Sequence, residues 1–224
     1  MAVTDEAILK IKDMIVSGQL RPGERLPPEK ELGEKLGLSR SSLREAVKAL
    51  EVIRVLDVRQ GDGTYVTSLE PDLLLEAMSF VVDLHDDGSV LEIFAVRRIL
   101  EAAAAGIAAR HISDEQAQAL IAMIETVSDN TSVEDLIQHD IMFHHAIAVA
   151  AGNPYLTSLI DGLSSDTVRA RVWRGLTDEN AVSKTLAEHH SILDAIVNGD
   201  VSLSQALMTA HVSGVENWLR AAAL

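Results

Sequence analysis

Apolar residues near the N-terminus recur at the spacing of an amphipathic helix. They share one helix face and end before Gly18: Ala7, Ile8, Ile11 and Ile15. A second helix is predicted from Pro28 to Gly37, because proline is favoured at a helix start and glycine just past a helix end. A third helix is predicted over residues 40–52, with the Ser39 hydroxyl as its N-cap.

An alternating apolar pattern replaces the helical one after residue 54. Residues 55–59 and 64–66 are predicted to form two short strands, joined by a turn at Gln60-Gly61-Asp62-Gly63. Three short helices followed by a hairpin are typical of a winged helix-turn-helix. We therefore assign residues 1–69 to a winged helix-turn-helix DNA-binding domain.

Beyond residue 70 the apolar pattern is helical throughout. Seven segments carry it: 72–83, 88–110, 114–127, 132–151, 154–173, 180–198 and 202–222. Turn-forming sequences such as Gly152-Asn153-Pro154 separate several of them. We predict that residues 70–224 form an antiparallel α-helical bundle, so that the whole fold is mostly α.

The composition supports two folded domains and excludes several classes of protein. A chain of 224 residues exceeds the usual size of one domain, and its 47% hydrophobic residues can bury a sizeable core. The lack of cysteine excludes disulfides, thiolate metal sites and a cysteine nucleophile. No apolar run is long enough to span a membrane, and the first residues lack the features of a signal peptide. We therefore expect a cytoplasmic protein with no membrane partner.

The net charge of −15 is confined to the second domain. Residues 1–69 contain eleven Lys or Arg and eleven Asp or Glu, whereas residues 70–224 contain eight and twenty-three. DNA phosphates repel an acidic domain, so the charge distribution favours nucleic-acid binding by the first domain alone.

Basic side chains occupy the polar face of the third predicted helix. Arg40, Ser41 and Arg44 lie opposite its apolar face, and the two arginines are one turn apart. An arginine fork can donate two hydrogen bonds to guanine in the major groove of DNA. A solvated helix face would show the same pattern, and this helix alone does not distinguish the two interpretations.

The surrounding residues resemble the GntR family of bacterial regulators over positions 8–66. Three motifs carry the similarity: Leu20-x-Pro22-Gly23-x-x-Leu26-Pro27-x-Glu29-x-x-Leu32, Leu38-Ser39-Arg40-x-x-Leu43-Arg44-Glu45-Ala46-x-x-x-Leu50 and Arg59-Gln60-Gly61-x-Gly63-Thr64-x-Val66. The pattern is similar to the FadR-type branch, and this resemblance implies a set of DNA contacts. They are Lys30, Ser39, Arg40, Arg44, Gln60 and Gly61, to which the polar helix face adds Ser41.

One position departs from the family pattern. Arg54 stands where glycine is usual, between the third helix and the hairpin. A non-glycine residue held at positive φ there would cost on the order of 1 kcal/mol. Because of Arg54, the angle between the hairpin and the third helix need not be the one that the resemblance implies.

Three predicted helices of the second domain carry metal-binding side chains within apolar stripes. Asp140 and His144 are four residues apart, so both can reach one ion. His189 and His211 lie on the stripes of the last two helices, and the stripe around His211 is predicted to contain Leu203, Leu207, Gly214 and Trp218. A single buried histidine is more often a core residue than a ligand. The three together with a buried aspartate, and with no Lys or Arg on these stripes, indicate a metal site.

The second domain also resembles the FCD ligand-binding domain over residues 75–222. The matching pieces are Asp140-x-x-Phe143-His144, Gly152-Asn153-Pro154, Glu188-His189-x-x-Ile192-x-x-Ala195-Ile196-x-x-Gly199-Asp200 and His211, with Arg97-x-x-x-Glu101 upstream. The resemblance implies the metal-binding subclass of that domain. It also implies effector-binding roles for Arg97, Glu101 and Asn153.

The expected ligand set suggests the chemistry of the effector. One carboxylate and three imidazoles around a divalent ion leave a net charge of about +1 and up to two open coordination positions. A small hydroxy, keto or sugar acid would fit these positions, and Arg97 could add a charge-assisted hydrogen bond. Zinc is the first candidate; nickel and manganese remain open, because the ligand types discriminate poorly between these metals.

We therefore expect a homodimeric regulator that binds a short inverted repeat in double-stranded DNA. The family resemblance favours a repressor. One alternative is a metal-dependent hydrolase, which would need a general base of the His-Glu-x-x-His kind that this sequence lacks. Another is a purely structural metal.

Other charged residues of the second domain are expected to have structural roles. Arg169, Arg171 and Arg174 are predicted to form a solvated or interface face. Glu188 and Asp200 are predicted to serve helix and turn structure.

Overall fold

Contacts within the computed structural model divide the chain into two units, Met1–Ala77 and Met78–Leu224. The structure describes residues 3–69, 89–128, 130–178 and 180–222. The helix predicted over 72–83 lies outside these residues. The predicted domain boundary after residue 69 falls at the end of the first described range.

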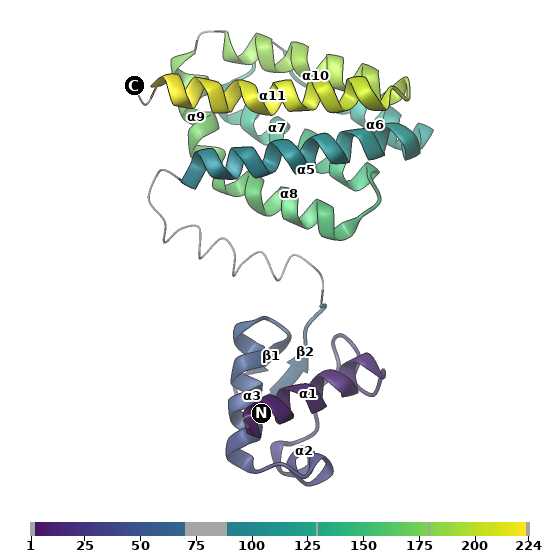
Figure 1. Ribbon diagram of the computed structural model, residues 1–224, viewed down its shortest axis with the longest axis vertical. Helices are drawn as coiled ribbons and strands as arrows, with labels where there is room; N and C mark the ends of the chain where they lie inside the picture. The colour runs from purple at the N-terminus through teal and green to yellow at the C-terminus, as the bar shows by residue number, and fades with distance from the viewer. Residues whose placement is uncertain (1–2, 70–88, 129, 179, 223–224) are drawn as a thin grey trace. The chain divides into compact units, whose positions relative to one another are not determined.

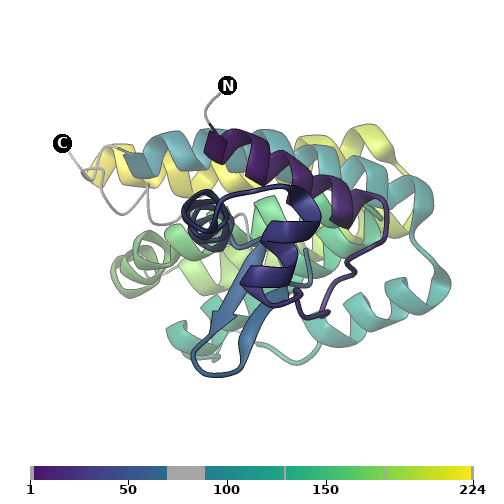
Figure 2. The same ribbon diagram turned by 90° about the horizontal axis from the view of Figure 1, so that it is seen from below.

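The first unit contains three helices and a hairpin (Figure 1). Its elements are α1 (Val3–Val16), α2 (Glu29–Leu36), α3 (Arg40–Val52), β1 (Leu56–Arg59) and β2 (Gly63–Val66). The strands are antiparallel, with Leu56 opposite Val66 and Arg59 opposite Gly63. The hairpin, blue in Figure 2, extends away from α1. This arrangement confirms the predicted winged helix-turn-helix.

Local signals in the sequence explain where these elements begin and end. Ser39 is the N-cap of α3, and its hydroxyl accepts a hydrogen bond from the backbone N–H of Ser42. Gly37 ends α2 in the left-handed conformation. The core behind α3 is built from residues of all three helices and both strands, among them Ile11, Leu32 and Leu43.

A short extended segment lines the second edge of β2. The backbone N–H of Val66 donates to the carbonyl of Glu24, and that of Leu26 donates to the carbonyl of Thr64. Arg25 therefore forms a bridge with Tyr65. These bonds hold the hairpin against the chain that leads into α2.

The second unit is helical throughout its described residues. Its helices are α5 (Ser89–His111), α6 (Asp114–Ile124), α7 (Val133–Ala150), α8 (Pro154–Asp166), α9 (Val168–Thr177), α10 (Ala181–Val197) and α11 (Val201–Ala222). α5 and α11 pack along each other, and α7 also packs against α5 (Figure 1). None of the helices in the described part of the chain has both the length and the apolar character to cross a membrane.

The predicted helix over residues 154–173 is wrong in one respect. The structure has two helices there, α8 and α9, separated at Thr167. The Thr167 hydroxyl donates to the carbonyl of Ser164 and accepts a hydrogen bond from Arg97. Apolar spacing continues across this break, so the pattern alone did not reveal it.

The predicted stripe of α11 is also displaced. His211 is buried, but Leu203 is 46% exposed, and the residues that share the buried face are Ser204, Met208, Val212, Val215 and Glu216. Two residues of this buried face, Ser204 and Glu216, are polar, so the spacing of apolar residues alone did not identify the face.

Arg54 has the conformation that its family position suggested, with φ of 59°. The hydroxyl of Thr67 donates to the Arg54 carbonyl over 2.7 Å and holds this turn. The backbone therefore bears a strain that a glycine would not have.

We predict that the Arg54→Gly variant is more stable than Arg54→Ala by about 1 kcal/mol, because both lose the side chain and only alanine keeps the steric cost of positive φ. Thermal and urea unfolding of the two variants measure the difference. Equal stabilities would show that the turn relaxes to negative φ in solution.

Candidate metal centre and nucleic-acid interface

Four predicted metal-binding side chains meet inside the second unit. α7 supplies Asp140 and His144, α10 supplies His189, and α11 supplies His211. One ligand atom from each lies within 4.8 Å of the others, and all four residues are buried. The spacing of four residues on α7 places its two side chains on one face, as the sequence predicted.

The separations between these atoms suit a metal ion. Asp140 Oδ1 lies 3.2 Å from His189 Nε2 and 3.5 Å from His144 Nε2. His211 Nε2 is 3.8 Å from the same oxygen and 3.2 Å from His144 Nε2. A tetrahedral zinc ion with bonds of ~2.0–2.1 Å would separate its ligand atoms by about 3.3 Å. The donor atoms and their spacing therefore fit a divalent ion.

Carboxylates face the remaining ring nitrogens of two of these histidines. His144 Nδ1 lies 2.5 Å from Glu101 Oε2, and His211 Nδ1 lies 2.8 Å from Glu188 Oε2. Such partners orient an imidazole toward a metal and raise its basicity. The prediction that Glu188 serves only helix structure is therefore wrong. Nothing in the sequence links it to His211, because the contact joins two different helices.

The third histidine is oriented by packing. The ring of Phe143 stacks on that of His189, with 4.0 Å between the centroids. His139 is also buried, with its ring centroid 5.6 Å from that of His189, whereas His145 pairs at the surface with Asp161. Aromatic stacking therefore replaces a carboxylate as the constraint on His189.

Asp140 also has an arginine partner, which the sequence interpretation missed. Its Oδ2 accepts a hydrogen bond from Nη1 of Arg171. Arg171 and Arg174 are both 5% exposed, so the predicted solvated or interface face is wrong for these two, and of the three arginines Arg169 is the exposed one. Their spacing of three residues places them on one helix face, and that spacing was the available signal. Because Arg171 binds Oδ2, Oδ1 stays directed toward the histidines.

The charged groups of the site shift one another's pKa values. Burial raises the pKa of Asp140, but the charges of His144 and Arg171 outweigh burial and hold it well below its usual range. Burial lowers the pKa of His144, but Glu101 and Asp140 outweigh it and raise that pKa to about 9. Burial dominates at His189 and lowers its pKa to about 3. Without a metal, the contacts of His144 therefore favour its protonated form, whereas burial favours the neutral form of His189.

A small cavity of about 30 Å³ lies beside Asp140 and His211. Arg171, Arg174 and Thr185 also line it. A cavity of this size has room for a few water molecules or one carboxylate group. The two arginines make this side of the ligand cluster cationic.

The residues predicted to bind an effector lie elsewhere. Arg97 donates to Glu101 Oε1 over 2.6 Å and to the hydroxyl of Thr167 over 2.5 Å, and both charged residues are buried. They orient His144 and do not line the cavity. Asn153 is exposed and caps α8 by accepting hydrogen bonds from the backbone of Tyr155 and Leu156. The effector-binding roles of these three residues stay predictions, and none of the three lines the cavity beside the ligand cluster.

The predicted DNA contacts lie on the surface of the first unit. Seven residues are exposed: Lys30 in α2, Ser39, Arg40, Ser41 and Arg44 at the start of α3, and Gln60 and Gly61 at the hairpin turn. On the opposite face of α3, Leu43, Ala46 and Leu50 enter the core. Arg44 Nη2 lies 3.4 Å from Glu29 Oε2, which links the start of α2 to α3.

Comparisons with known proteins agree with both units. A model of bacterial regulatory proteins of the gntR family matches residues 3–66, and an FCD domain model matches residues 92–214. The galactonate operon transcriptional repressor of Escherichia coli is 31% identical, over 91% of this chain and 92% of its own. The HTH-type transcriptional regulator LutR of Bacillus subtilis is 28% identical, over 92% and 96%.

A solved structure has the same fold over almost the whole chain. It is described as Streptococcus agalactiae GntR and is 26% identical, with a TM-score of 0.72. The match covers 96% of this chain and 99% of that one.

We predict that Glu188→Gln weakens zinc binding about 10–100-fold, because the neutral amide lacks the negative charge that raises the basicity of the His211 ring. Competition against a chromophoric chelator measures the affinity. Glu134→Gln, an exposed substitution at the start of α7, is the matched control and should bind zinc as the wild type does.

Zinc binding should also release a proton from His144 at neutral pH, because its pKa in the metal-free protein is about 9 and zinc requires the neutral ring. Apparent zinc affinity should therefore rise with pH until the pH passes that value. Calorimetry in buffers of different ionisation enthalpy counts the protons. Affinity independent of pH between neutrality and that value would contradict a protonated His144.

Proposed function

The chain belongs to the GntR family of bacterial regulatory proteins and carries an FCD domain, and we propose that it is a repressor controlled by a small acid bound at a metal site. Like the relatives that it matches, it is a transcriptional regulator and not an enzyme. The galactonate operon repressor among them supports repression as the mode of action.

Residues 1–69, within the first unit, are the proposed DNA-binding domain. In this proposal α3 enters the major groove, where Arg40 and Arg44 contact bases, while Lys30, Ser39 and Ser41 contact the backbone. The hairpin turn at Gln60 and Gly61 contacts the adjacent groove. The exposed arginines opposite a buried helix face support this role. A homodimer would present two such helices to the halves of an inverted repeat.

Residues 70–224 are the proposed sensing and dimerisation domain. Asp140, His144, His189 and His211 would hold a divalent ion, with zinc the first candidate and nickel or manganese the alternatives. The convergence of these four buried side chains is the single observation that carries the proposal. When bound, the ion would supply a positive charge and open coordination positions for an anionic ligand.

The cavity beside the cluster favours a carboxylate. Arg174 is buried, and the nearest carboxylate oxygen to it among the described residues is that of Asp178, 3.7 Å away. Arg171 is already bound to Asp140. Arg174 is therefore the group that would pair with an effector carboxylate, in place of Arg97. The name of the galactonate operon repressor makes sugar acids the first class to test.

The test uses the 224-residue chain, an operator selected from random duplexes, and galactonate as the first probe. We expect galactonate to weaken operator binding of the zinc-loaded protein by about 5–150-fold, the range of typical allosteric couplings. Arg174→Gln should lose the galactonate response but keep zinc and operator affinity. Arg169→Gln, an exposed change on the same helix, should respond as the wild type does.

The controls separate a sensing metal from a structural one. His189→Gln and chelated protein should bind the operator without responding to any acid of a panel of hydroxy, keto and sugar acids. If chelation lowers only the melting temperature and leaves a response intact, the metal is structural and the proposal is wrong.

A further inference from the structure

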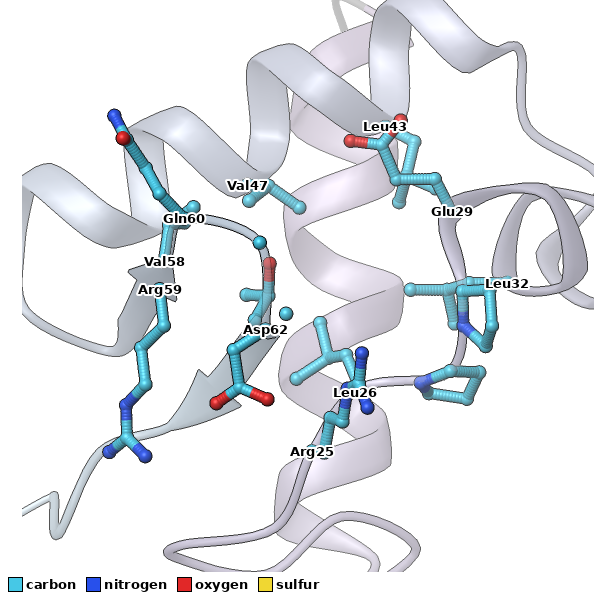
Figure 3. Close-up of a pocket in the computed structure, with 15 residues that line it drawn as sticks. Arg25, Leu26, Glu29, Leu32, Leu43, Val47, Val58, Arg59, Gln60 and Asp62 are labelled. Atoms are coloured by element: carbon cyan, nitrogen blue, oxygen red, sulfur yellow. The ribbon is translucent and has the colours of Figure 1, made fainter.

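A groove of about 410 Å³ lies in the first unit between the helices and the hairpin (Figure 3). The start of α2, the inner side of α3 and both strands contribute to its walls. The residues that matter here are Arg25, Glu29, Leu43, Arg59, Asp62 and Gly63. Leu43 and Val47 of α3 line the groove, and so do Gln60 and Gly61 of the hairpin turn. The groove therefore lies between two elements that would face the same duplex.

The acidic groups of this groove have partners. Glu29 Oε2 lies 3.4 Å from Arg44, and Asp62 accepts a hydrogen bond of 3.0 Å from the hydroxyl of Tyr65. Arg59 donates to Asp57 over 2.9 Å, and its guanidinium lies 4.3 Å from the centroid of the Tyr65 ring. These contacts reduce the repulsion that the two carboxylates would exert on an anion in the groove.

Arg25 differs from these residues. It is exposed, and within the described part of the chain no ion pair engages its guanidinium. It is the arginine of the groove whose charge is left available to a ligand. Figure 3 shows its side chain on the same side of the groove as Asp62.

The hairpin fixes the position of Arg25. Its backbone bridges to Tyr65, and its guanidinium lies against Gly63, where an added Cβ would be 2.9 Å from Nη2. Gly63 also has φ of 145°, which favours glycine. The lack of a side chain at Gly63 thus lets the guanidinium of Arg25 approach the hairpin backbone this closely.

We propose that Arg25 binds a phosphate of the DNA strand that runs between α3 and the hairpin. This rests on the proposed placement of α3 in the major groove. A major and a minor groove are separated by one sugar–phosphate backbone, so a helix in one and a hairpin at the other leave that backbone over the space between them. Phosphate contacts of this kind set register and affinity without reading sequence.

The test is operator binding by Arg25→Gln, with Arg21→Gln as the control of equal charge change outside the groove. Arg25→Gln should weaken binding to the operator and to a mixed-sequence duplex by the same factor. It should also reduce the slope of log K against log salt by about 1, as the loss of one phosphate contact predicts. Arg25→Lys should keep the salt slope because it keeps the charge, and Arg21→Gln should change neither quantity. Circular dichroism of each variant verifies the fold.

The Arg40→Ala and Arg44→Ala variants distinguish failure of the proposed Arg25 contact from failure of the proposed placement of α3. If these lose operator binding while Arg25→Gln keeps wild-type affinity and slope, the inference about Arg25 is overturned and the placement of α3 stands. If all of them bind normally, the placement of α3 fails as well. A loss in Arg25→Gln on the operator alone would also overturn the inference, because it would indicate base recognition and not a phosphate contact.

Discussion

The second unit depends on a chain of buried charges that alternate in sign. Arg97 pairs with Glu101, which faces His144, and His144 lies beside Asp140, which is bound by Arg171. A buried charge without a partner is costly, so each member of this chain requires its neighbour. The residues come from α5, α7 and α9, and their pairing therefore fixes how these three helices meet. Two of the four donor residues, Asp140 and His144, belong to this network.

Much of the architecture could be predicted from sequence. The first unit followed from local signals that act within a few residues, such as the Ser39 cap, the glycine after α2 and the turn of the hairpin. The helices of the second unit followed from apolar spacing, and Asp140 and His144 followed from their positions on one helix. These features depend on near neighbours, whose effects a single sequence displays directly.

The misassigned residues depend on contacts between distant segments. Thr167 interrupts a helix because it is engaged by Arg97, seventy positions away along the chain. Arg171 and Glu188 were assigned to the surface or to helix structure because charge normally indicates exposure, yet each is held by an ionisable group on another helix. Arg97 and Glu101 were rightly singled out, but they support a histidine and do not reach the cavity. Whether a buried polar residue is a ligand or a support depends on which helix it faces, and periodicity cannot supply that.

The interruption at Thr167 has a consequence for how α8 and α9 evolve. In one continuous helix each residue is rotated about the helix axis by a fixed angle from the residue before it. The number of residues between two side chains therefore fixes the angle between their directions. The break releases α9 from the rotational phase of α8. A change that rotates α8 about its axis need not turn Arg171 and Arg174 away from Asp140, so the apolar packing of one helix and the cationic face of the next can vary independently.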